Sequence, residues 1–291
     1  MTGLVDSLAS LPTTEIKCLD DGHVRLVDCM PRLHPSNHTM EYAIAECART
    51  SYGNGSKDLA SDVKLIRYLY KNQHTSPFES VKFKFYIRCP KFVAIHLLRH
   101  RTANFNEFSQ RYAKIKDDAF YHPSAVANGI RVASTLNKQG STPIDDTAKQ
   151  AALLEEVKKA ERLCDELFVS YNKLIGMGLA KEIARFCLPE AVYTELYFTM
   201  DLHNLLRFLR LRMDADHAQY ETVVYARAIH DLIAPLVPNV LEAFREYTLS
   251  AMTLSVKEIS ALRDGTGLVS ESKSDQDEFA KKLDRLGVED D

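Results

Sequence analysis

The sequence predicts a single α/β domain, and three observations lead to that fold class. Residues 81–89 and 192–200 alternate apolar with polar side chains, as half-buried strands do. The apolar positions of residues 147–179 recur every three or four residues, as in an amphipathic helix. The chain has 291 residues, of which 45% are hydrophobic and 26% charged, and this length can bury a core without disulfides or a structural metal.

The first predicted strand lies at residues 81–89. Val81, Phe83 and Ile87 fall on one face, and the intervening residues are Lys, Tyr or Arg. Pro90 ends the strand because proline has no amide proton for a sheet ladder.

A helix and a loop are predicted next. Residues 91–100 predict a helix that packs Phe92, Ile95 and Leu98 inward. Residues 102–110 lose the helical period among threonine and asparagine, so they predict a structured loop.

The middle of the chain combines a long loop with a long helix. Residues 123–148 are rich in Gly, Ser, Thr, Asn and Pro and predict a surface loop. The helix at 147–179 follows, and Gly176 and Gly178 end it.

The remaining elements follow in order after that helix. A short helix is predicted up to Pro189, then a strand at 192–200 and helices at about 202–213, 218–235 and 239–253.

The C-terminal segment is distinguished by its charge. Residues 255–291 hold six Lys or Arg and ten Asp or Glu, whereas the whole chain has a formal charge of −3. We therefore expect a catalytic or binding domain at 1–254 and a flexible acidic tail at 255–291, with one short helix at 276–286.

Composition also excludes several classes of protein. The first 254 residues sum to +1, so no global basic field for duplex nucleic acid exists. The six cysteines form neither a CxxC pair nor a zinc-type ladder with histidine, which predicts a reduced protein. No apolar run reaches membrane-spanning length and the first residues do not read as a signal peptide. The cytoplasm or the nucleus remains, and we expect a cytoplasmic protein.

The most unusual segment runs from His96 to Tyr112. It contains Arg99-His100-Arg101, a later arginine and several amides and hydroxyls. Successive helix positions differ by about 100°, so three adjacent cations cannot all face solvent as one stripe. Because a guanidinium fork suits phosphate or carboxylate oxygens, the segment is either a site for an anionic ligand or a structural cluster of salt bridges.

A metal site at the same helix is the weaker interpretation. His96 and His100 have the i, i+4 spacing of metal ligands. The general-base glutamate of an HExxH helix is missing, and Arg99 and Arg101 would repel a divalent cation. We therefore expect no metal.

More cations occur in the C-terminal half. Arg185 lies among Ile183, Phe186 and other apolar residues, where an unpaired guanidinium would be costly, so it requires an anion. Arg210 is interpreted as part of a solvated helix face. The second basic group consists of His203, Arg207, Arg210, Arg212 and His217.

Five separated blocks resemble one known family, the flavin-dependent thymidylate synthases. The family signature of Arg-His-Arg, seven residues and Ser is similar to Arg99-His100-Arg101 followed by Ser109. The resemblance extends over roughly residues 40–250. The other matching blocks are Asn106-Glu107-x-Ser109-x-Arg111-Tyr112, His74-Thr-Ser76-Pro-Phe-Glu79, Arg185-x-x-Leu-Pro189, and Leu211-Arg212 with His217-Ala-Gln219-x-Glu221.

The resemblance implies a fold and an activity. The fold would be α/β (α+β) with a central, mostly antiparallel sheet and flanking helices, assembled as a homotetramer with active sites between subunits. The activity would be methylation of dUMP to dTMP, with methylenetetrahydrofolate as the carbon donor and NADPH reducing FAD.

The resemblance also implies the binding residues, some of them through backbone groups. The FAD contacts would be Ser76, Arg99, His100, Arg101, Glu107, Asp201, Leu202, His203 and Arg207. The dUMP contacts would be His96, Leu97, Leu98 and Arg99, then Glu107, Phe108, Ser109, Gln110 and Arg111 from another subunit, and Arg185 and Arg212.

The chemistry assigns roles to three of these arginines. Methylation at C5 of uracil needs negative charge to be stabilised through N3 and O4, and Arg212 is the candidate for that catalytic role. Arg111 and Arg185 are candidates for holding the phosphate. The family uses no protein nucleophile on the pyrimidine, so Ser109 is expected to contact the ligand only.

Three departures from the family pattern are visible. His96 stands where glutamine is expected, and Arg207 where asparagine or histidine is usual. The run between Arg212 and His217 is one residue longer, which would rotate His217 by about 100° on a continuous helix unless a π-bulge absorbs it.

The competing function is a non-catalytic nucleotide- or RNA-binding module. It would use the arginines with Phe105, Phe108 and Tyr112 as stacking surfaces. The +1 balance of the first 254 residues argues against this function and leaves room for secondary RNA binding only.

Overall fold

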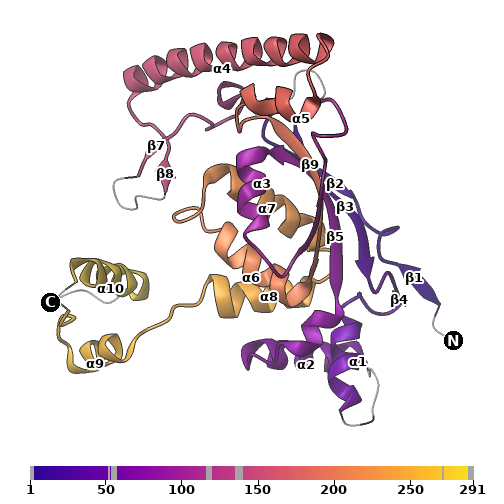
Figure 1. Cartoon of the computed structure of the whole chain (residues 1–291). Coiled ribbons are helices and arrows are strands. Elements are labelled where there is room, and N and C mark those ends of the chain that lie inside the picture. Colours follow the sequence, from indigo (N-terminus) through magenta and orange to yellow (C-terminus); the bar gives the residue numbers. More distant parts are fainter. Residues whose placement is uncertain are drawn as a thin grey trace. The chain divides into compact units, whose positions relative to one another are not determined.

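The computed structural model describes residues 3–51, 53, 58–115, 120–134, 140–270 and 272–287. The chain divides into two compact units, residues 1–242 and 243–291 (Figure 1). The predicted boundary at residue 254 lies within the second unit and stays a prediction.

The first unit is built on a five-stranded, wholly antiparallel sheet, which confirms the predicted fold class. The strand order is β2-β3-β5-β9-β6. The strands are β2 (Glu15–Cys18), β3 (Gly22–Met30), β5 (Lys82–Pro90), β9 (Tyr193–Asp201) and β6 (Asn104–Glu107).

The alternation read from the sequence sets the register of the two central strands. Phe85 of β5 pairs with Phe198 of β9, and both side chains are fully buried. The intervening residues Lys84 and Tyr197 face the opposite side, where the Lys84 ammonium lies over the Tyr197 ring. Period-two patterning therefore separates a buried from a wet face, as expected for an antiparallel sheet.

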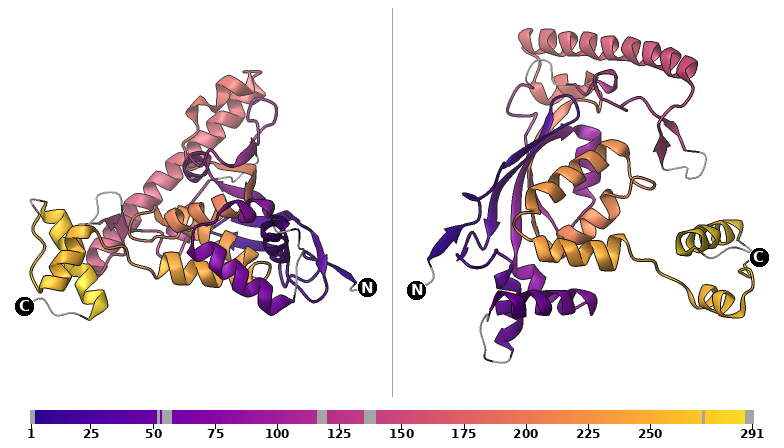
Figure 2. Two further views of the ribbon diagram at one scale, coloured as in Figure 1. Left: turned by 90° about the horizontal axis from the view of Figure 1, so that it is seen from below. Right: turned by 180° about the vertical axis from the view of Figure 1, so that it is seen from behind.

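Three helices cover the buried face of the sheet: α3 (Lys91–Leu98), α6 (Leu202–Arg212) and α7 (Tyr220–Ile233) (Figures 1 and 2). α6 begins at an N-cap, because the Asp201 carboxylate accepts from the Asn204 amide at 2.9 Å. The 3-10 turn η1 (Ser76–Ser80) packs against α6 and brings Ser76 to this layer.

The region around residues 123–189 forms a separate layer at one end of the sheet. The predicted long helix is α4 (Thr147–Gly176), and Gly178 follows it with a φ of +92°. α5 (Lys181–Ala184) and η3 (Arg185–Cys187) pack against α4. The predicted surface loop contains only η2 (Pro123–Ala125), β7 (Val132–Ala133) and β8 (Ser141–Thr142), and residues 135–139 of it lie outside the described residues.

The N-terminal elements were not predicted from the sequence. α1 (Tyr42–Thr50) and α2 (Leu59–Lys71) are joined by an ion pair between the buried side chains of Arg49 and Asp62. A register shift in β3 between Leu26 and Asp28 interrupts the alternation by which a strand is recognised. The other N-terminal elements that were not predicted are β1 (Leu4–Asp6), β2 and β4 (Leu33–Pro35).

Two local predictions are wrong. Residues 104–107, expected within a loop, form the edge strand β6, because β9 offers them a hydrogen-bonding partner. In α3 the buried side chains are Val93, Ala94 and Leu97, whereas Ile95 and Leu98 are 42% and 39% exposed. A helix that is apolar on all sides carries no polar stripe to show which face is buried.

Substitution of Gly22 by alanine is expected to destabilise the first unit by about 1–3 kcal/mol through overpacking. A Cβ atom at Gly22 would lie 1.9 Å from the Tyr225 hydroxyl and 2.9 Å from the Arg88 carbonyl oxygen, which that hydroxyl contacts at 2.8 Å. Urea unfolding measures the change. Gly176→Ala is the control, since no atom lies within 4 Å of its Cβ position, and equal stability of the two variants would contradict the prediction.

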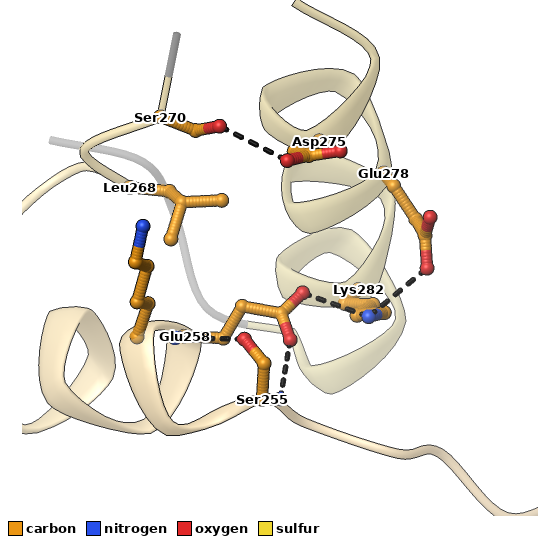
Figure 3. A pocket seen from close by; sticks show the side chains of 8 residues that line it. Ser255, Glu258, Leu268, Ser270, Asp275, Glu278 and Lys282 are labelled. Atoms are coloured by element: carbon orange, nitrogen blue, oxygen red, sulfur yellow. Dashed lines mark hydrogen bonds and ion pairs between the residues drawn. The ribbon is translucent and has the colours of Figure 1, made fainter. Parts of the chain in front are cut away.

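α9 (Val256–Asp264) and α10 (Lys273–Leu286) are helices of the second unit. α9 begins with a capping box between Ser255 and Glu258. In α10, Lys282 pairs with Glu258 at 2.7 Å and with Glu278 at 3.1 Å, beside an open cleft of about 260 Å³ (Figure 3). The predicted helix at 239–253 is α8 (Pro238–Phe244), followed by one π-helical turn, η4 (Arg245–Leu249).

No helix among the described residues combines the length and apolar character needed to cross a bilayer. The cytoplasmic location expected from the sequence stays a prediction.

Candidate active site

The arginine-rich segment lies where α3 ends beside α6. Arg99 caps α3, and His100 and Arg101 follow it. The Nε atom of Arg212, the last residue of α6, donates a hydrogen bond to Nε2 of His100 at 3.0 Å. The His100 ring also meets the ring of Phe208 edge-on, at 4.8 Å between centroids. The structure thus brings together two blocks of sequence that are 112 residues apart.

His96 in α3 and His100 just after this helix both have lowered pKa values. Burial, and then the Arg212 charge, lower the pKa of His100 to about 4. Burial and the same arginine lower the pKa of His96, whereas Glu221 opposes the shift. His96 Nδ1 lies 3.2 Å from the hydroxyl of buried Thr222. His100 is therefore neutral at pH 7, and Arg212 carries the local positive charge.

Three exposed arginines, two at the end of α3 and one on α6, carry no protein anion within the described residues. Within the described part of the chain, Arg99, Arg101 and Arg207 form no ion pair or side-chain hydrogen bond. Unpaired guanidinium forks have the donor chemistry that phosphate oxygens require. The residues present therefore fit the pyrophosphate of a dinucleotide such as FAD.

The other predicted FAD residues are placed differently. Both carboxylate oxygens of Asp201 contact Asn204, and Leu202 is completely buried. A contact by either residue would therefore come from the backbone. Ser76 and His203 belong to η1 and α6, two elements that pack together.

Glu107 is held at the end of β6 by residues of its own chain. Its carboxylate accepts from the hydroxyl of buried Thr194 at 2.8 Å, and the Lys91 ammonium lies at 3.7 Å. An ordered carboxylate at this edge remains available for a ligand on its second oxygen.

Two of the remaining predicted nucleotide contacts, Arg111 and Arg185, form a second cluster at α5. Arg111 pairs with Glu182 at 3.1 Å, and Arg185 Nε donates to the backbone oxygen of Glu182 at 3.2 Å. The expected buried, apolar surrounding of Arg185 is wrong, because Ile183 and Phe186 are 53% and 76% exposed. Exposure of its apolar neighbours removes the desolvation cost on which that expectation depended.

The two clusters lie at opposite ends of α3. Near the start of α3, the Phe92 amide donates a hydrogen bond to the backbone oxygen of Glu190, a residue that follows η3. The other end of α3 leads to His100 and its contact with Arg212. Eight helical residues span about 12 Å. α5 lies beside α4 in both views, away from α6 (Figures 1 and 2). A single chain therefore does not gather all the predicted cations at one point.

The residues between the clusters differ in what they can offer a ligand. Leu97 is fully buried and Gln110 nearly so. Leu98, by contrast, is partly exposed. The Ser109 hydroxyl accepts from the Arg111 amide at 3.4 Å, and no described histidine or carboxylate contacts it. Ser109 therefore lacks the relay of an activated nucleophile.

The extra residue between Arg212 and His217 is absorbed outside the helix. α6 ends at Arg212, and the following turn is closed by Asp214, whose carboxylate lies 2.8 Å from His217 Nδ1. No π-bulge is needed. Arg212 therefore keeps its helical spacing to Phe208 and Arg207.

Two of the three aromatic side chains that the RNA-binding module would use for stacking pack against the protein itself. Phe105 packs against Phe198 of the sheet at 5.3 Å between centroids. Phe108 packs into the core around Tyr171 and Tyr193. Tyr112 alone of the three is well exposed, at 78%.

Sequence reasoning missed the residues that orient the predicted ones. They are Phe208 and Thr222 beside the two histidines, Thr194 and Lys91 beside Glu107, and Glu182 between the two arginines. None of these contacts carries a local signal, since even Glu182 and Arg185, three positions apart, meet through the Glu182 backbone oxygen and not through its side chain. No group of three or more possible metal ligands occurs among the described residues.

Comparisons with known proteins identify the family. The family model "Thymidylate synthase complementing protein" matches residues 32–239. A flavin-dependent thymidylate synthase of Dictyostelium discoideum is 45% identical over 268 residues, covering 92% of this chain and 86% of that protein. One from Thermus thermophilus is 41% identical over 275 residues, covering 94% and 91%.

A solved structure also matches. The crystal structure of a UMP/dUMP methylase from Streptomyces cacaoi bound with 5-Br dUMP has a TM-score of 0.66 and 32% identity. The match covers 80% of this chain and 98% of that one.

Proposed function

The chain belongs to the flavin-dependent thymidylate synthase family, and from this premise we propose that it methylates dUMP to dTMP. Methylenetetrahydrofolate is the proposed carbon donor and NADPH the proposed reductant of bound FAD. One observation carries the proposal: Arg212 meets His100 of the Arg99-His100-Arg101 segment, and Arg99, Arg101 and Arg207 have no anion within the described chain.

The protein's part in the reaction is binding and electrostatics. Arg212 beside N3 and O4 stabilises the negative charge that develops when C5 of the pyrimidine attacks the carbon donor. FAD, when bound and reduced, supplies the hydride that the new methyl group requires. Arg99, Arg101 and Arg207 hold the FAD pyrophosphate, and Ser109 contacts the nucleotide without attacking it.

The proposed nucleotide site is shared between subunits. Arg111 and Arg185 bind the phosphate at α5, and the ion pair of Arg111 with the Glu182 carboxylate supports this assignment for Arg111. Arg212 lies at the other end of α3. The separation of the two clusters supports active sites completed by neighbouring subunits of a homotetramer.

The proposed cofactor makes a direct prediction. Purified protein, as isolated or after addition of FAD, is expected to be yellow with the visible absorbance of a bound flavin, and to oxidise NADPH in a manner dependent on dUMP. Absorbance spectroscopy and an NADPH assay measure both. Protein that stays colourless with added FAD would contradict the proposal, and affinity for single-stranded RNA that falls steeply with salt would favour the RNA-binding alternative.

A further inference from the structure

Arg212 is held on one side only. Its Nε donates to His100 Nε2 at 3.0 Å, and within the described chain no other hydrogen bond or ion pair involves this guanidinium. A guanidinium is planar, so a bond to Nε leaves both terminal nitrogens free and restricts the direction in which they point.

The imidazole that makes this bond is itself fixed. The His100 amide bonds the Leu97 carbonyl oxygen at 3.0 Å, which ties the residue to the end of α3. The Phe208 ring contacts the imidazole edge-on. Phe208 and Arg212 are four residues apart on α6 and so lie on one face. The His100 ring therefore lies between the side chains of Phe208 and Arg212 on α6.

The hydrogen bond from Arg212 determines which tautomer of the His100 imidazole is present. Arginine has no acceptor, so Nε2 of His100 must carry a lone pair and the proton of the neutral ring must be on Nδ1. Arg212 is the charged group that faces the ring from α6, and burial acts in the same direction. Protonation of the ring would abolish the acceptor and place a second cation against the guanidinium.

We infer that His100 is a positioning residue for Arg212, and that its neutral imidazole directs the two free guanidinium nitrogens toward the N3 and O4 edge of the pyrimidine. This role adds to any contact with FAD and rests on the proposed function. It concerns residues of this chain alone and predicts effects on dUMP binding as well as on turnover.

Two substitutions at His100 separate the role from mere packing. His100→Leu keeps an apolar side chain but has no acceptor, so kcat/KM for dUMP, normalised to FAD content, is expected to fall about tenfold to a hundredfold, the usual effect of losing a charge-assisted hydrogen bond. His100→Gln carries an amide oxygen that can accept from Nε, so it is expected to recover most of this loss. Calorimetric titration of the FAD-loaded protein with dUMP gives the affinity independently of turnover. A glutamine variant as impaired as the leucine variant would overturn the inference.

A double-mutant cycle tests whether His100 acts through Arg212. In an Arg212→Ala background, His100→Leu is expected to change dUMP affinity by less than about twofold, because coupled residues are not additive. An undiminished loss in that background would overturn the inference. If the parent protein neither binds dUMP nor forms dTMP, the proposed function fails instead, so the two failures are distinct.

The pH dependence supplies a third readout. With a His100 pKa of about 4, the bond is intact above that pH and is lost as the pH falls through it. The ratio of the dUMP dissociation constants of the parent and His100→Gln is therefore expected to stay constant from pH 8 to pH 5. Divergence of the two proteins near the ordinary histidine pKa of about 6.5 would contradict the arrangement.

Discussion

Replacing Arg212 with alanine is expected to lower kcat for dTMP formation by about 10²–10³-fold, the usual effect of removing a preorganised donor to a developing anion. Its guanidinium is half-buried at the end of α6 and bonded through Nε to His100. Burial lowers the pKa of Arg212, yet with an ordinary value far above neutrality the group stays charged. The effect should appear in single-turnover formation of dTMP, where product release does not contribute.

Two controls accompany this variant. Arg210→Ala removes an exposed arginine of the same helix that has no partner within the described chain, so it tests for a general charge effect and is expected to retain near-parent turnover. Ser109→Ala is expected to retain measurable turnover, because no described residue could activate this hydroxyl. Near-parent activity of Arg212→Ala, or a trapped covalent adduct of dUMP on Ser109, would overturn these assignments.

Co-expression of Arg111→Ala and Arg212→Ala subunits is expected to restore activity that neither variant shows alone. Arg111 lies at α5 and Arg212 at the opposite end of α3. If each site takes these two residues from different subunits, random assembly leaves about a quarter of the sites with both arginines intact. The measurement is dTMP formation by mixed oligomers isolated through two different affinity tags.

The control for complementation is a chain that carries both substitutions, co-expressed with the Arg212→Ala variant. No mixed oligomer of that pair contains an intact Arg212, so activity should stay at the background level. The opposite outcome is that mixed oligomers of the two single variants are no more active than either variant alone. Each site would then take both arginines from one subunit.

The central part of the fold could be predicted because its signals are local. Apolar and polar side chains alternate along β5 and along β9, and apolar positions recur every three or four residues along α4. Each of these patterns lies within a single continuous segment of the chain. Asn104 and Glu107 have little strand propensity, so β6 could not be found without its partner β9, which lies about ninety residues later in the chain.

The candidate site divides in the same way. Motif spacing identified Arg99-His100-Arg101, Arg111, Arg185 and Arg212, because a signature is a property of sequence order. Motif spacing did not show which of these residues lie together in space. The environment expected for Arg185 was wrong, since exposure depends on which surfaces meet elsewhere in the molecule.

The sequence alone determined the fold class, the family and the identity of the cationic side chains, since composition, periodicity and motif order belong to the chain itself. Tertiary structure decided that His100 meets Arg212, that Glu182 joins Arg111 to Arg185, and that three arginines remain free for an anion within the described chain. The reason is physical: each of these outcomes depends on contacts between distant segments, and the packing of the whole sheet and its helices determines which segments meet.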